Sequence, residues 1–404
     1  MQAGTAQVLR AGAPRMWQLG TLGFVALIDT SMISPVIASQ ALLLGADRVL
    51  AATIAGSYSL VAIFTTALAG YLVDRLGRRR LLASGLLADL LLMLGYVFST
   101  SPLQLLGVRV AHAVADSFVV PSALASIGDL FQKRLGRSLA IYWTFVAVAI
   151  IVGSGSASVL VLRFGHPGVY LTVAGAIACT IGLLKFGGYS FREGATHEKN
   201  SYAALLAAHA VPIAVSSSAM LSMYLVIGGV VGAAPSLLVE RAGLDERGAA
   251  ALVAQFMALS TGASLPIFFV AERVASKVSP YLGAAIGLVA ASVSTLLLEA
   301  GFSFRPYWYG SALAFGVALG FVFLTSSYIA VSLPSPIRGT ASGVSQAMGL
   351  LGVVLGSLVT ALLIGLHLPS GAFVVIGLPS VASAALAASF WAFRGSNRKP
   401  ENRA

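Results

Sequence analysis

The 404-residue chain is 58% hydrophobic and only 10% charged, with a mean hydropathy of +0.90. Soluble domains carry about a quarter of their residues as charged side chains, so the composition excludes a soluble protein and indicates an integral membrane protein. The formal net charge of +11 does not indicate a nucleic-acid partner, because 19 of the 25 lysines and arginines fall in the termini and in the loops of one side.

Twelve apolar runs are long enough to cross about 30 Å of hydrocarbon as helices of about 20 residues. They fall near residues 16–40, 49–73, 80–98, 102–128, 138–162 and 168–186 and, after a polar stretch, near 209–238, 247–270, 280–298, 306–332, 340–365 and 371–393. We therefore predict an all-α membrane protein with twelve transmembrane helices in two six-helix bundles. The predicted domains are an N-terminal bundle (1–186), a linker (187–202), a C-terminal bundle (203–393) and a tail (394–404).

The distribution of lysine and arginine predicts the orientation in the membrane. These residues are retained inside when spans insert, so we expect both termini and the linker to be cytoplasmic. The N-terminus lacks the pattern of a cleavable signal, and its first apolar run is predicted to remain as a span of a multi-pass protein of the cell membrane. The single Cys179 excludes intrachain disulfides and multi-cysteine metal sites.

Five ionisable residues are predicted inside spans, where an unpaired charge is costly and a functional role is the default hypothesis. They are Asp29, Asp89, Arg109, His112 and Asp116. Asp29 and Asp116 each lie 13 residues from the cytoplasmic end of their span, which is a depth of about 20 Å. Arg109, His112 and Asp116 follow the i, i+3, i+7 spacing of one helix face.

The stretch from Gly70 to Leu82, GYLVDRLGRRRLL, joins the second and third runs and carries five charges. It cannot lie in hydrocarbon, so a tight connection at the cytoplasmic surface is predicted. It resembles the loop 2/3 signature of the major facilitator superfamily, G-x-L-x-D-R-x-G-R-[RK]-x-x-L, which it matches at Gly70, Leu72, Asp74, Arg75, Gly77, Arg78, Arg79 and Leu82. A basic turn obeying the positive-inside rule would explain the arginines, but not Gly70 or Asp74 at this spacing.

The resemblance implies a cytoplasmic gate made by Gly70, Asp74, Arg75, Gly77, Arg78 and Asp129. In this family the acid equivalent to Asp74 faces the start of the eleventh span, near Gly339 here, where the helix dipole favours an anion. Arg78 is expected to reach Asp129 at the end of the fourth span, and partly hydrated ion pairs of this kind can break. The alternative for Asp129 is a lone solvated acid near a helix end.

Further stretches resemble signatures of the drug:proton antiporters of this family. LIDTSMISPVIA around Asp29 is similar to their D-x-T…P stretch, with Ser31 in place of the threonine. Arg109 matches the arginine of the fourth-span signature R-x-x-Q-G, in which His112 and Ala113 replace the other two residues. We predict that Asp29, Arg109, His112 and Asp116 carry proton coupling. Asp89 is left out of this set, because its span is usually peripheral in this family. The alternative for the four residues is a static buried network without a role in coupling.

The seventh and tenth spans, which would border a central cavity, carry hydroxyl and aromatic side chains and no midspan charge. Such a wall suits a lipophilic or amphiphilic substrate, although ordinary helix packing is the alternative. The predicted substrate-binding residues are Ser217, Tyr224, Phe321 and Tyr328.

Short matches between the halves at offsets of 198 and 201 residues indicate a duplicated six-helix unit, as in this family.

Enzyme motifs such as H-E-x-x-H, a P-loop or G-x-S-x-G do not occur, and the five histidines lack metal-ligand spacing. No catalytic residue, cofactor or metal is therefore predicted.

The predicted function is secondary active transport by alternating access, as a monomeric antiporter that exports a lipophilic or amphiphilic small molecule in exchange for protons. Two alternatives stay open: a proton-linked importer or uniporter of a small organic solute, and a membrane enzyme or lipid flippase.

Overall fold

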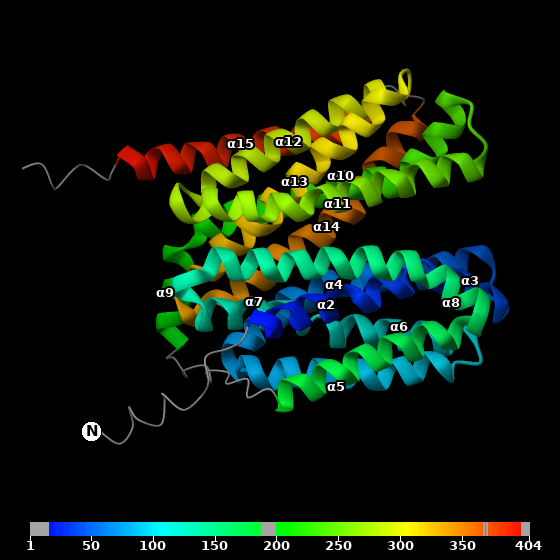
Figure 1. Ribbon diagram of the computed structural model, residues 1–404, viewed down its shortest axis with the longest axis horizontal. Helices are drawn as coiled ribbons and strands as arrows, with labels where there is room; N and C mark the ends of the chain where they lie inside the picture. The colour runs from blue at the N-terminus through cyan, green and yellow to red at the C-terminus, as the bar shows by residue number, and fades with distance from the viewer. Residues whose placement is uncertain (1–15, 187–198, 367, 369–370, 397–404) are drawn as a thin grey trace, which may run out of the picture. The chain divides into compact units, whose positions relative to one another are not determined.

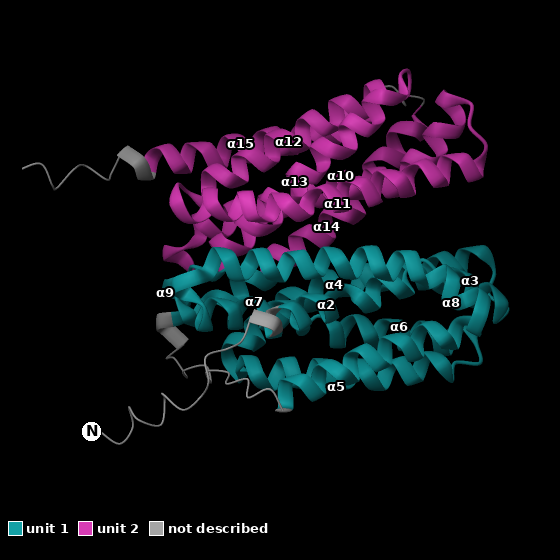
Figure 2. Ribbon diagram, viewed as in Figure 1, with its two compact units in different colours: residues 1–205, 331–343 teal, residues 206–330, 344–404 magenta. Residues whose placement is uncertain are grey.

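The computed structural model describes residues 16–186, 199–366, 368 and 371–396, and the regular structure within these ranges is entirely helical (Figure 1). It divides into two compact units, of which unit 1 comprises residues 1–205 and 331–343 and unit 2 comprises residues 206–330 and 344–404 (Figure 2). Most of the predicted linker and most of the predicted tail lie outside the described residues. The domain boundaries proposed from the sequence therefore stay a prediction.

The helices of unit 1 from α2 to α8 follow one another with short connections. They are α2 (Met16–Ile33), α3 (Ile37–Leu43), α4 (Arg48–Leu76), α5 (Arg78–Val97), α6 (Pro102–Asp116), α7 (Val119–Leu130), the 3₁₀ turn η1 (Gln132–Arg134), α8 (Leu135–Phe186) and α9 (Lys199–Ala208), whose last residues belong to unit 2. The 3₁₀ turn η2 (Ser335–Ile337) also belongs to unit 1. The sequence did not predict α9, which covers the end of the expected linker.

Unit 2 consists of longer, mostly unbroken helices. They are α10 (Ala210–Ala242), α11 (Glu246–Lys277), α12 (Pro280–Gly301), α13 (Arg305–Val331), α14 (Arg338–Gly365) and α15 (Ala372–Ser396). The last residue of α13 and the first six residues of α14 belong to unit 1. A segment from the second half of the sequence thus completes the unit built by the first half.

Eleven segments of the described residues are long and apolar enough to cross a membrane. One of them, Gln132–Lys185, covers all but the last residue of α8. As a straight helix, α8 would be about 78 Å long, far more than the bilayer needs. The chain reverses within α8 at Gly165, whose φ of 68° favours glycine, and Pro167 follows two residues later (Figure 1). This segment therefore supplies two crossings, and the predicted twelve-span all-α fold is confirmed.

The first and fourth spans are interrupted where the sequence suggested continuous runs. Pro35 separates α2 from α3, and Pro121 lies in the first turn of α7, just after α6 ends. A proline lacks the N–H for a helical hydrogen bond and its ring clashes with the carbonyl four residues earlier. Asp29 lies just over one turn before the first interruption, and Asp116 is the last residue of α6.

The spans of unit 1 differ in how far they are buried. In the fourth span, Pro102–Leu130, 72% of the most apolar window is buried, against 33% in α5 and 28% in the segment that covers nearly all of α8. Outer helices expose large apolar residues such as Leu91, which is 59% exposed, as a surface toward lipid requires. The fourth span is the interior of unit 1, and it carries Arg109, His112 and Asp116.

Candidate functional site

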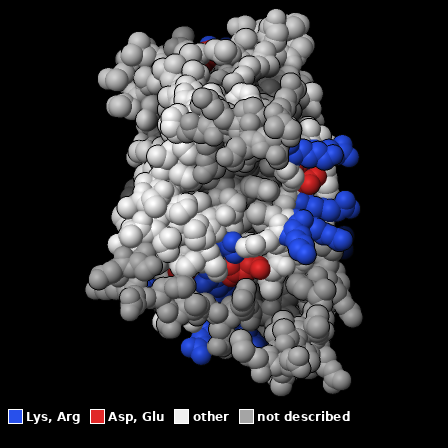
Figure 3. All heavy atoms as spheres, turned by 90° about the vertical axis from the view of Figure 1, so that its left-hand side faces the viewer, with Lys and Arg blue, Asp and Glu red and all other residues white. Residues whose placement is uncertain are grey.

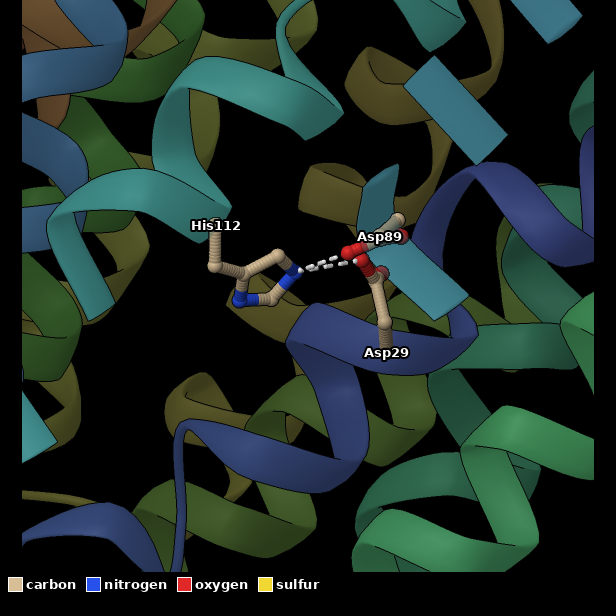
Figure 4. Close-up of side chains that lie close together, drawn as sticks. All are labelled: Asp29, Asp89 and His112. Atoms are coloured by element: carbon tan, nitrogen blue, oxygen red, sulfur yellow. Dashed lines mark hydrogen bonds and ion pairs between the residues drawn. The ribbon is translucent and has the colours of Figure 1, made fainter. Parts of the chain in front are cut away.

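His112 lies between two carboxylates in the core of unit 1. Its Nε2 atom lies 3.0 Å from Asp29 Oδ2 and 3.0 Å from Asp89 Oδ1, and none of the three side chains is more than 3% exposed (Figure 4). The three residues come from α2, α5 and α6. The hydroxyl of Tyr96 lies 3.0 Å from the other ring nitrogen, Nδ1, and holds the orientation of the imidazole. Because Nε2 carries at most one hydrogen, the two carboxylates compete for a single donor.

A second cluster adjoins the first one. The hydroxyl of Tyr58 donates to Asp116 Oδ2, and the guanidinium of Arg109 stacks on the Tyr58 ring at 4.6 Å. The same hydroxyl accepts a hydrogen bond of 3.2 Å from Thr30, the neighbour of Asp29. The ring of Tyr58 also lies 5.4 Å from the imidazole of His112, so the two clusters form one network.

Arg109 is the buried cation of this network. It is 1% exposed, and its Nη2 atom donates to Ser34 Oγ at 3.3 Å. Its Nε and Nη1 atoms make no hydrogen bond within the described residues. Its stacking on Tyr58, which bonds Asp116, places a positive charge beside a carboxylate without a direct ion pair.

The structure thus brings together the four residues proposed for proton coupling, although their role stays a prediction. Sequence reasoning missed Asp89, Tyr58 and Tyr96. Asp89 met the criterion applied to the others, an ionisable side chain inside a span, and was set aside because its span was assumed to be peripheral. Its side chain nevertheless points inward to His112 from α5.

The same trio could also hold a metal ion. The ligand atoms of Asp29, Asp89 and His112 all lie within 4.8 Å of one another. Two carboxylates and one imidazole suit a divalent transition metal, and Tyr96 is placed as an outer partner that orients the histidine. A search for histidine spacing along the sequence could not find this set, because each ligand comes from a different helix.

Asp74 lies in the last turn of α4 and binds the start of α14. Its Oδ1 atom accepts from the Gly339 N–H at 2.9 Å, and its Oδ2 atom accepts from the Thr340 N–H at 2.7 Å and the Thr340 hydroxyl at 2.8 Å. The carboxylate satisfies backbone donors of the first helical turn and faces the positive end of the helix dipole. The contact expected from the sequence is therefore present.

Arg78 and Arg338 bind Asp129 from two sides. Arg78 Nε lies 3.1 Å from Asp129 Oδ2 and its Nη2 lies 3.3 Å from Asp74 Oδ1. Arg338 Nη1 lies 2.5 Å from Asp129 Oδ1, and the Ser335 hydroxyl donates to the same oxygen at 2.8 Å. The Asp129 side chain is only 6% exposed, so it is not a lone solvated acid. The sequence predicted the Arg78 partner but not Arg338 or Ser335.

Glycines allow α4 and α14 to approach this closely. A Cβ atom on Gly339 would lie 2.6 Å from the Gly70 carbonyl oxygen, and one on Gly343 would lie 2.6 Å from the Thr66 carbonyl oxygen. Gly77 connects α4 to α5 with a φ of 98°, a conformation that favours glycine. Steric constraints thus explain why both positions of the loop signature, Gly70 and Gly77, are glycines.

Arg75 contacts the neighbouring α9. Its guanidinium lies 5.4 Å from the Tyr71 ring and 4.9 Å from the Tyr202 ring. The Tyr202 hydroxyl forms a hydrogen bond with the hydroxyl of Thr340. Burial raises the pKa of the Tyr202 phenol above its ordinary value, so the phenol stays protonated at neutral pH. We call the set Asp74, Arg78, Asp129, Arg338 and Gly339 the latch; its role as a gate stays a prediction.

The four residues proposed for substrate binding lie in unit 2. The Tyr224 ring packs 5.4 Å from Phe323, and Phe321 is 6% exposed and packs against α12 at Gly287. Ser217 is buried with its hydroxyl unbonded among the described residues, and Tyr328 is half-buried. These contacts fit helix packing as well as binding, and the substrate role stays a prediction.

Comparisons with known proteins agree with this architecture. A family model described as Major Facilitator Superfamily matches residues 19–336. "Sugar efflux transporter A" of Escherichia coli (strain K12) is 26% identical over 131 residues, which are 32% of this chain and 33% of that protein. "Multidrug resistance protein MdtM" of the same strain is 29% identical over 166 residues, 41% of this chain and 39% of that protein. The matches thus span less than half of each relative.

Solved structures resemble the chain over most of its length. The human organic anion transporter MFSD10 (TETRAN) has a TM-score of 0.73 at 16% identity and covers 93% of this chain and 100% of its own. A bacterial homologue of the iron transporter ferroportin, in an outward-facing state, has a TM-score of 0.71 at 14% identity and covers 95% and 100%. At these identities the likeness shows the fold alone.

Proposed function

Because this chain belongs to the major facilitator superfamily and is a membrane transporter rather than an enzyme, we propose that it exchanges protons for a lipophilic or amphiphilic small molecule that it exports. The observation that carries the proposal is the placement of His112 between the carboxylates of Asp29 and Asp89. Efflux rather than uptake is supported by the names of the two Escherichia coli relatives, at 26% and 29% identity.

The trio lacks a hydrogen-bond donor when both carboxylates are ionised. Nε2 of His112 can donate to one of them, and Asp89 Oδ1 has no hydrogen-bond partner among the described residues. Two carboxylates that share a water-poor site repel each other, and binding one proton removes this repulsion and supplies the missing donor. The trio is therefore built to take up a proton and to release it when water or a cation reaches it.

Two hydroxyl groups lie between the trio and a further acid, Asp116. Thr30 follows Asp29 and donates to the Tyr58 hydroxyl, which donates to Asp116. Neutral hydroxyl groups accept and donate at the same time, so Thr30 and Tyr58 can carry a proton as far as Asp116. Thr30 itself contacts Asp29 through its backbone N–H, which donates to Asp29 Oδ1. The guanidinium of Arg109 lies 4.6 Å from the Tyr58 ring, so a fixed positive charge stands beside these hydroxyl groups.

The test is proton movement in proteoliposomes that contain the purified protein and a pH-sensitive dye. A panel of lipophilic dyes and drugs is added under an imposed pH gradient, and substrate and proton fluxes are recorded together. We expect Asp29→Asn and Asp89→Asn to abolish substrate-coupled proton flux while downhill substrate movement remains. Glu246→Gln, the same chemical change at an exposed acid of α11, should leave coupling intact.

Coupling that is unchanged in both aspartate variants would refute the proposal. A metal-ion role for the trio is distinguished by repeating the assay with a chelator and with added Zn²⁺ or Mn²⁺. Substrate flux that needs the metal and ignores the pH gradient would assign the trio to a metal ion instead of a proton.

A further inference from the structure

We propose that the groove between the start of α5 and the end of α8 binds the headgroup of an anionic phospholipid of the cytoplasmic leaflet. The groove has a cavity of about 320 Å³. Two cations, Arg79 of α5 and Lys185 of α8, line it together with five apolar residues from the same two helices. This site lies wholly within unit 1 and does not depend on proton coupling or on the transported substrate.

The lining matches the chemistry of a phospholipid. The floor is apolar, since Leu82 and Leu86 are each 1% exposed, while Arg79 and Lys185 are exposed at the rim. The seven lining residues include two cations and no acid, which suits a phosphate group. Basic groups beside an apolar wall attract an anionic headgroup, whereas a neutral lipid gains nothing from them.

The position of the groove along the helices favours a lipid over a water-soluble anion. Arg79 is the second residue of α5 and Lys185 is the last but one of α8, so both charges lie at the end of a span. Exposed apolar side chains continue from there along both helices, with Leu87 at 54% and Leu91 at 59% on α5 and Leu171 at 52% on α8. Acyl chains can lie along this surface while the phosphate stays at the basic rim.

The consecutive residues Arg78 and Arg79 make different contacts. Arg78 is buried in the ion pairs of the latch with Asp74 and Asp129. Arg79 points to the other side of the helix start and lines the groove. The arginine run therefore does more than fix the orientation of the chain, because Arg79 occupies a shaped site with an apolar floor.

The proposal is tested by lipid binding to the purified full-length protein. The protein is incubated in detergent with equal amounts of phosphatidylglycerol and phosphatidylcholine, and bound lipids are identified by native mass spectrometry. We expect the wild type to retain phosphatidylglycerol preferentially, and Arg79→Gln and Lys185→Gln to weaken its affinity about fivefold for each cation removed. Arg79→Lys, which keeps the charge, should retain binding.

A matched control separates this site from general electrostatics. Lys133→Gln with Arg134→Gln removes the same charge from another exposed loop at the same end of unit 1 and should leave phosphatidylglycerol binding unchanged. Equal loss in this control, or full binding in the Arg79→Gln, Lys185→Gln double variant, would overturn the proposal. So would displacement of the lipid by millimolar glycerol 1-phosphate, which would make the groove a site for soluble phosphates. Gel filtration and thermal melting confirm that each variant is folded.

Discussion

At the scale of single residues, Tyr58 joins the two parts of the buried network. The variant Tyr58→Phe removes the donor to Asp116 and the acceptor for Thr30, but keeps the ring under Arg109. A buried carboxylate that loses its donor costs about 1–3 kcal/mol. We expect a lower melting temperature and altered pH dependence of substrate-coupled proton flux. Tyr307→Phe, at a ring that is 46% exposed, is the control and should change neither quantity.

Asp129 is the residue whose loss should destabilise unit 1 most directly. Its replacement by alanine leaves Arg338 without a carboxylate partner, and Arg78 with only the 3.3 Å contact to Asp74. Removing one member of a buried ion pair costs about 3–5 kcal/mol. We expect Asp129→Ala to lower the thermal unfolding temperature clearly, and Glu240→Ala, at an exposed acid, to have little effect. Equal melting temperatures would mean that the ion pairs contribute nothing to stability.

Single-residue predictions from the sequence succeeded where a motif fixes the spacing. Asp74 and Arg78 lie in one signature, and their contacts with Gly339 and Asp129 could be predicted from it. Asp89 could not be assigned in the same way, because its partner His112 comes from another helix and only the packing decides which face of α5 turns inward. The role of these residues in transport is still a prediction.

At the scale of helices, the crossing of α4 and α14 depends on small residues. In Gly339→Ala the new methyl group would lie 2.6 Å from the Gly70 carbonyl oxygen and 2.8 Å from Asp74 Oδ1, so the helices must move apart or the Asp74 hydrogen bonds must lengthen. Overpacking of this kind costs about 1–3 kcal/mol. We expect a lower melting temperature, measured on the purified protein.

Gly107→Ala in α6 is the matched control for this crossing. A Cβ atom there meets nothing within 4 Å, and alanine is a better helix former than glycine. It should therefore leave the melting temperature unchanged or raise it slightly. If Gly339→Ala behaves like Gly107→Ala, the close approach of α4 and α14 does not contribute to stability.

Run lengths in the sequence predicted the spans, but not their internal geometry. The reversal between the fifth and sixth runs was expected, and Gly165 makes it. The breaks at Pro35 and Pro121 were not expected, because a proline can be accommodated in a membrane helix or can interrupt it, depending on whether neighbouring groups satisfy the freed carbonyls.

At the scale of the whole chain, the division into units differs from the division of the sequence into halves. Residues 331–343 belong to unit 1 because Asp74 and Asp129 bind Gly339, Thr340 and Arg338. The family resemblance predicted one of these contacts. Composition and run length alone could not predict these contacts, since the partners are more than 200 residues apart. Each arginine by itself is already explained by the positive-inside rule, so it does not indicate a partner.

The orientation of the chain can be tested independently of transport. On the face shown in Figure 3, where α9 lies, Lys and Arg side chains gather with fewer Asp and Glu, and this basic end is expected to be cytoplasmic. In a Cys179→Ser background, single cysteines are placed at Lys133, next to the basic end of α8, and at Thr100, beyond the opposite end of α5. A membrane-impermeant maleimide added to intact cells should label Thr100→Cys and spare Lys133→Cys, and both should react in inverted vesicles. The reverse labelling pattern would show that the basic end faces outward, and the proposed entry of protons from outside would then have to be reversed.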